Sequence, residues 1–138
     1  MGSLSIWHLL ILLVLFGSPF ALYFVIASGS RSDLRRPSTF LHASFIAWSL
    51  AIVAAIVATV LLTDPDAESL VVGILVIAFA VAGWAYLMAL AILASRTGRS
   101  GILWAGLAFI TSPIGVVVSY PMMIGALRRR DEDHRNAT

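Results

Sequence analysis

Four long apolar runs, separated by short polar segments, account for almost the whole chain. The runs cover about residues 5–28, 39–63, 70–95 and 101–127, and no Asp, Glu, Lys or Arg lies inside them. A helix needs about 20 apolar residues to cross a bilayer, and lipid offers backbone polar groups no partner. The pattern therefore predicts an all-α integral membrane bundle of four transmembrane helices. They form a single domain, residues 1–127, followed by a charged C-terminal tail at 128–138.

Proline and glycine interrupt the first and the fourth run. Gly17 and Pro19 lie in the middle of the first run, and Pro113 and Gly115 in the middle of the fourth. Proline has no N–H to donate to the helical ladder, so we expect both helices to bend there. The fourth run has an alternative, because it can fold back at residues 111–115 as a re-entrant hairpin. Arms of about 12 residues would reach only about 18 Å, leaving a turn near mid-depth that other protein must cover.

Alanine recurs at helical spacing in the second and third runs. The predicted helix-packing residues are Ala47, Ala51 and Ala55 in the second run and Ala78, Ala82, Ala85 and Ala89 in the third. Small side chains in a row let a neighbouring helix approach closely. Because only a short acidic turn joins these two runs, the pattern predicts a tight antiparallel pair.

The composition agrees with a membrane protein, since 60% of the 138 residues are hydrophobic and 12% are charged, against about 25% charged in soluble domains. Cysteine is absent, which excludes disulfides, thiolate metal sites and cysteine nucleophiles. All nine basic residues are arginines, and they lie in loops and the tail, where lipid headgroups would adjoin them. The chain lacks the soluble basic face that nucleic-acid binding needs. We therefore predict the lipid bilayer as a partner and no nucleic acid.

Arginine counting gives the expected orientation. The residues that set it are those of the two basic loops, Arg31, Arg35, Arg36, Arg96 and Arg99. With four crossings these five face one side and the four arginines of the tail face the other. Arginine-rich loops stay in the cytoplasm and an uncharged N-terminus is easily translocated, so we predict cytoplasmic basic loops and both termini outside. Two alternatives stay open: the re-entrant hairpin, which puts all nine arginines inside, and insertion in both orientations.

Residues 5–11, SIWHLLI, lead to the pair Phe16-Gly17 in the first run. This stretch resembles the N-terminal anchor of twin-arginine translocase A-type subunits and of other small bacterial inner-membrane proteins. The resemblance implies a bacterial inner membrane and an N-terminus that faces out. In the translocase family an amphipathic helix follows the Phe-Gly pair, whereas residues 18–27 stay apolar here. The resemblance therefore implies no translocase role.

Candidate chemistry is sparse. His8 and His42 begin consecutive antiparallel helices, so they would lie at opposite faces of the bilayer and cannot share a haem. The serines and threonines have no acid or histidine companion at a consistent depth. Tryptophans and tyrosines at this density are typical of helix packing and of the membrane interface, with a quinone or lipid cleft as the alternative. We predict no catalytic, cofactor-binding or metal-binding residue, and no enzyme.

Two functions fit this pattern. The first is a non-catalytic small multi-pass protein that acts through helix contacts, as an accessory subunit of a larger membrane assembly or as an immunity or stress factor. Its partners would be other membrane subunits or further copies of itself. The alternative is a small homo-oligomeric channel or transporter lined by the broken first and fourth spans, since unwound backbone at membrane depth is tolerated where it is buried in protein or wet.

Overall fold

The computed structural model describes residues 6–28, 33–61 and 64–136. All regular elements within these ranges are helices: α1 (Ile6–Ala27), α2 (Arg35–Leu61), α3 (Pro65–Arg96), α4 (Gly101–Ile110) and α5 (Ile114–Asn136). The predicted all-α class is thus confirmed. By length and composition, α2 and α3 are the two described helices that are long and apolar enough to cross a membrane.

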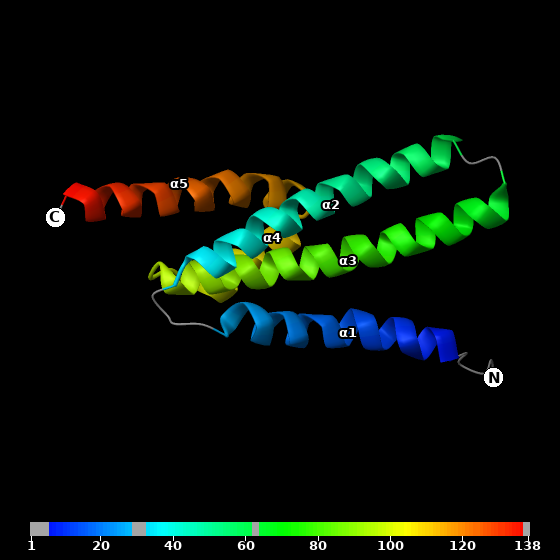
Figure 1. Ribbon diagram of the computed structural model, residues 1–138, viewed down its shortest axis with the longest axis horizontal. Coiled ribbons are helices and arrows are strands. Elements are labelled where there is room, and N and C mark those ends of the chain that lie inside the picture. Colours follow the sequence, from blue (N-terminus) through cyan, green and yellow to red (C-terminus); the bar gives the residue numbers. More distant parts are fainter. Residues whose placement is uncertain (1–5, 29–32, 62–63, 137–138) are drawn as a thin grey trace.

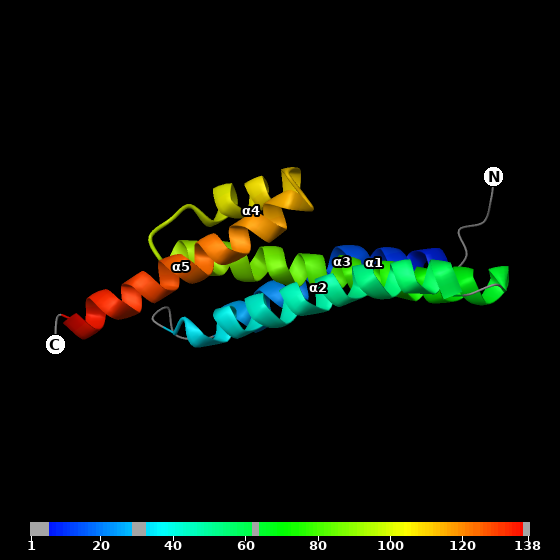
Figure 2. The same ribbon diagram turned by 90° about the horizontal axis from the view of Figure 1, so that it is seen from above.

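The other helices pack around α3. Figures 1 and 2 show α1 along one side of α3 and α2 along another, with α4 against the C-terminal half. This half contributes more buried side chains than any other helix, and Tyr86, Leu90 and Leu93 have no exposed surface. Ile26 of α1 and Leu41 of α2 complete the core from either side. Burial is therefore concentrated where α3 is surrounded, near the end that carries the basic loops.

The helices α2 and α3 run antiparallel across a short acidic turn. Asp64 caps α3 by accepting a hydrogen bond from the backbone N–H of Asp66 at 3.0 Å, and Pro65 opens the helix. The rings of Trp48 and Phe79 join the pair at 5.3 Å. Of the predicted packing alanines, Ala51, Ala82, Ala85 and Ala89 are buried, Ala55 is half-buried, and Ala47 and Ala78 are exposed. The alanine-to-alanine contact itself stays a prediction.

The predicted interruption of the first span is wrong, because α1 is one continuous helix with Pro19 inside it, whereas the bend expected at Pro19 stays a prediction. A proline inside a helix removes one hydrogen bond, whereas ending the helix there would leave up to four N–H and four C=O groups without partners. Continuing the helix is therefore the smaller cost in an apolar run. Gly17 is not needed for a close approach either, since a Cβ built on it would meet nothing within 4 Å.

The predicted single span at 101–127 is also wrong. The chain is interrupted at Pro113 as expected, but it reverses there instead of bending, so that α4 and α5 form a helical hairpin (Figures 1 and 2). The Ser112–Pro113 peptide bond is cis. Thr111 donates to Leu107 O through its N–H at 3.0 Å and through Oγ1 at 2.6 Å. Gly115 donates to Thr111 O at 2.8 Å. These bonds replace part of the helical ladder at the turn, which helps the chain to reverse here.

Gly115 is required by the geometry of this turn. A Cβ at this position would lie 2.8 Å from Ala108 O and would overlap the hydroxyl of Thr111. The hairpin therefore requires glycine at position 115. The sequence analysis predicted Gly115 only as a helix breaker beside Pro113.

The helix ends differ from the predicted boundaries. The helices α2 and α3 begin several residues earlier, at Arg35 and Pro65. The segment 128–136 of the predicted tail continues α5, with Arg128 paired to Glu132 at 3.4 Å. The tail is thus the last part of a helix over its described length.

Candidate functional site

A buried hydrogen-bonded group fastens α5 to α3. The hydroxyl of Tyr86 donates to Val116 O at 3.0 Å and lies 2.8 Å from Ser119 Oγ. Tyr86 has no exposed surface and Ser119 is 7% exposed. A buried hydroxyl without a partner costs free energy, so these contacts fix both the height and the rotation of α5 against α3.

A second contact fastens α5 to α2 nearer the surface. His42 Nδ1 lies 2.5 Å from the hydroxyl of Tyr120, and the ring of Phe45 stacks on Tyr120 at a centroid distance of 4.1 Å. The sequence analysis excluded a haem shared by His42 and His8 and predicted no other partner for His42. Its partner lies 78 residues away, and no local pattern links the two positions.

Replacing Tyr86 with Phe should lower the free energy of unfolding by about 1 kcal/mol, because it removes the interhelical bonds and keeps the ring. Tyr23→Phe is the matched control, since Tyr23 is 49% exposed on α1. Thermal unfolding in detergent measures both variants. Equal stability of the two variants would contradict the role of the buried hydroxyl.

The hairpin turn lies beside the middle of α3. Ser112 and Phe109 line a cavity of about 220 Å³ together with Ala80 and Gly83 of α3, and Phe109 stacks on Trp84 at 6.2 Å. The turn residues 111–113 are nevertheless exposed on their outer side. The two residues that flank the turn, Ile110 and Ile114, are 80% and 71% exposed. The tip of the hairpin thus presents apolar side chains and non-helical backbone on the outside of the molecule.

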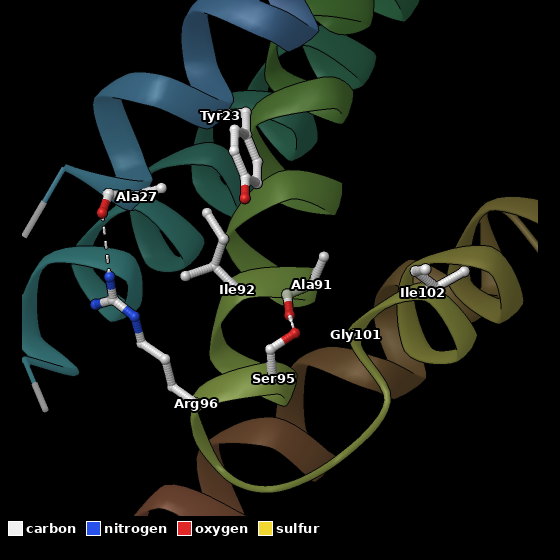
Figure 3. Close-up of a pocket in the computed structure, with 8 residues that line it drawn as sticks. All are labelled: Tyr23, Ala27, Ala91, Ile92, Ser95, Arg96, Gly101 and Ile102. Atoms are coloured by element: carbon white, nitrogen blue, oxygen red, sulfur yellow. Dashed lines mark hydrogen bonds between the residues drawn. The ribbon is translucent and has the colours of Figure 1, made fainter. Parts of the chain in front are cut away.

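An open groove lies between α1 and α4, with α3 as its floor (Figure 3). Its volume is about 760 Å³, and its lining is Tyr23, Ala27, Ala91, Ile92, Ser95, Arg96, Gly101 and Ile102. Ser95 donates to Ala91 O at 2.8 Å, within its own helix. The guanidinium of Arg96 is turned toward α1, where it donates to Ala27 O at 3.4 Å and to Asp33 O. The groove is therefore mostly apolar, with small side chains on its floor.

Gly101 sets how close α4 approaches the floor of this groove. A Cβ at Gly101 would overlap Ala91 O and Ser95 Oγ. The first turn of α4 therefore lies directly on the backbone of α3. The sequence analysis predicted a close approach only between the second and third runs and did not predict this contact.

The described arginines gather at one end of the molecule, where α1, α3 and α5 end and α2 and α4 begin (Figure 1). Arg36 donates to Ser28 O at 2.6 Å, and Arg130 donates to Arg96 O at 3.0 Å. These bonds satisfy carbonyl groups at helix C-termini, where cations are also favoured by the helix dipole. Of the predicted topology-setting residues, Arg35, Arg36, Arg96 and Arg99 lie at this end, and Arg31 lies outside the described residues.

The predicted separation of the tail from the basic loops is wrong. It assumed a fourth crossing, whereas α5 runs back beside α4 and brings Arg130 into contact with the end of α3. The expected bias of one arginine between the two sides therefore disappears in this fold. All the described arginines can face the same side of a membrane.

Within the described residues, no group of three or more His, Asp or Glu side chains lies together in a way that could hold a metal ion. Comparison of the chain with known protein families, with curated proteins and with solved structures finds no match. The resemblance of residues 5–17 to translocase anchors therefore stays a prediction.

Proposed function

We propose that the chain is a non-catalytic integral membrane protein that acts through helix contacts, as an accessory subunit of a larger membrane assembly. In this proposal the two long apolar helices α2 and α3 cross the bilayer together with α1, whose apolar stretch Ile11–Ala27 is shorter, and α4 and α5 form a re-entrant hairpin. The lengths of α1, α2 and α3, which have 22, 27 and 32 residues, correspond to about 33, 40 and 48 Å. Large apolar side chains are exposed along all three, far beyond what a soluble monomer tolerates.

The arginine-rich end supports one orientation. Because arginine-rich loops stay in the cytoplasm, this end would face inward, in the bacterial inner membrane that residues 5–17 imply. Three crossings then leave the N-terminus outside and the C-terminus inside. This topology replaces the expectation that both termini lie outside.

The observation that carries the proposal is the exposed turn of the hairpin. Since it lies beside the middle of α3, it would sit near mid-depth in the bilayer. Non-helical backbone at that depth is tolerated only where protein buries it or water reaches it. Residues 111–113 are exposed in the single chain, and the proposal is that another protein covers them. That partner is another membrane subunit or a second copy of this chain.

The channel alternative has less support. It relied on broken first and fourth spans lining a path, and α1 is continuous through Pro19. Within the described residues, the hairpin turn is then the one interruption that could place non-helical backbone at membrane depth.

Cross-linking from Ser112 tests the proposal in a chain that has no cysteine of its own. Ser112→Cys in native membranes, coupled to a membrane-permeable benzophenone maleimide and then irradiated, should give a product larger than the single chain. A product of twice the chain mass identifies a second copy, and any other discrete mass identifies another subunit. Phe20→Cys is the control, because Phe20 is 72% exposed on α1 and should face lipid. Equal or absent cross-linking at both positions would overturn the proposal.

A further inference from the structure

A third pocket lies at the arginine-rich end, between α5 and the loop that joins α3 to α4. Its volume is about 510 Å³. Its charged lining is Arg99, Arg129, Arg130 and Asp133, and its apolar lining includes Pro121, Met122, Gly125 and Ala126. We propose that this pocket binds an anionic glycerophospholipid, with the phosphate on the arginines and an acyl chain along the apolar part. The proposal rests on the membrane placement given under Proposed function.

The face of α5 that lines this pocket changes from apolar to charged along the helix. The lining residues of α5 recur at spacings of three and four, so they form one face of the helix. This face is apolar from Pro121 to Ala126 and charged from Arg129 to Asp133. The change occurs between Ala126 and Arg129, about 4.5 Å at 1.5 Å per residue, which is comparable to the thickness of a headgroup layer, about 5–8 Å on each side of the core. A phospholipid has the same order of chain and headgroup.

The pocket has a net positive charge. Three arginines and one aspartate leave an excess of two positive charges among the lining side chains. Guanidinium groups bind phosphate with paired, charge-assisted hydrogen bonds, and basic pockets between membrane helices attract anionic lipids. A zwitterionic lipid of zero net charge would satisfy less of this excess.

Two of the pocket arginines are held in place by contacts within the chain. The guanidinium of Arg99 lies over the ring of Trp104 at 5.2 Å, and Arg130 donates to Arg96 O at 3.0 Å. Side chains fixed before binding lose less conformational entropy when a ligand arrives. A free phosphate ion would use the arginines but leave the apolar part of the pocket empty, so a membrane lipid fits the lining better.

The test uses the full chain purified into nanodiscs of phosphatidylcholine, with and without phosphatidylglycerol. Native mass spectrometry measures retained lipid, and thermal unfolding measures the stabilisation. Phosphatidylglycerol should be retained and should raise the unfolding temperature of the unmodified chain. Arg129→Gln should weaken phosphatidylglycerol binding about tenfold, the loss expected for one charge-assisted contact.

Arg128→Gln is the matched control. It removes the same charge one residue away, from a side chain that is 84% exposed, pairs with Glu132 and lies outside the pocket lining. If Arg128→Gln and Arg129→Gln weakened phosphatidylglycerol binding equally, the binding would reflect general attraction by the basic end. That result would overturn the proposed lipid site. No loss in Arg129→Gln would overturn it as well.

Gly125→Leu tests the apolar part of the pocket, at a position where an added Cβ would meet nothing within 4 Å. It should reduce phosphatidylglycerol retention and leave any effect of inorganic phosphate unchanged. Equal stabilisation by inorganic phosphate, together with full lipid retention in Gly125→Leu, would assign the arginines to a soluble anion instead. Failure of the membrane placement is seen separately, since alkaline carbonate extraction reports insertion regardless of lipid headgroup.

Discussion

Single cysteines at Ser69, Ser100 and Asn136 are expected to label from two different sides of the membrane. A membrane-impermeant maleimide should reach Ser69→Cys from outside and Ser100→Cys and Asn136→Cys only from the cytoplasm. The chain has no cysteine, so each variant carries one reactive thiol. The expectation is all-or-none, because moving the arginine-rich tail across the bilayer would require several guanidinium groups to pass an apolar core.

The position of Asn136 decides between the two folds of the fourth run. Labelling of Asn136→Cys from the same side as Ser69→Cys would mean four crossings and would contradict the hairpin. Labelling of every position from both sides would mean insertion in both orientations. Ser112→Cys serves as the internal control, since a turn covered by protein near mid-depth should resist the impermeant reagent from either side.

Run length and composition were enough to predict helices, and they located α2 and α3 well, because long apolar runs between charged turns have few other solutions. They could not separate Pro19 from Pro113. The same residue type lies inside α1 and at a chain reversal. The difference lies in the surrounding contacts, since Thr111 and Gly115 donate replacement hydrogen bonds around Pro113.

The contacts that hold the hairpin were also beyond sequence reasoning. Tyr86 and Ser119 are 33 residues apart, and His42 and Tyr120 are 78 apart. A single sequence shows that such side chains can form hydrogen bonds but not which ones meet. The candidate groove depends in the same way on Gly101, whose importance is visible only once the backbone of α3 lies against it.

Replacing Gly101 with Ala should destabilise the protein by about 2 kcal/mol, the middle of the range for overpacking a close contact. The added Cβ would overlap Ala91 O and Ser95 Oγ. The Ser95 hydroxyl can rotate away, but Ala91 O cannot move freely because it belongs to the backbone of the central helix. To relieve the overlap α4 has to lift away from α3, which widens the groove and strains the hairpin. Unfolding in detergent measures the loss.

Gly106→Ala is the control within the same helix. A Cβ at Gly106 would meet nothing within 4 Å, and Ala is a better helix former than Gly by about 1 kcal/mol. This variant should therefore be as stable as the unmodified chain or more stable. Because the two substitutions are chemically identical and five residues apart on α4, a stability difference between them isolates the contact with α3. If Gly101→Ala unfolds no more easily than Gly106→Ala, then α4 does not lie against the backbone of α3 at Ala91, and the groove between α1 and α4 loses the wall that defines it.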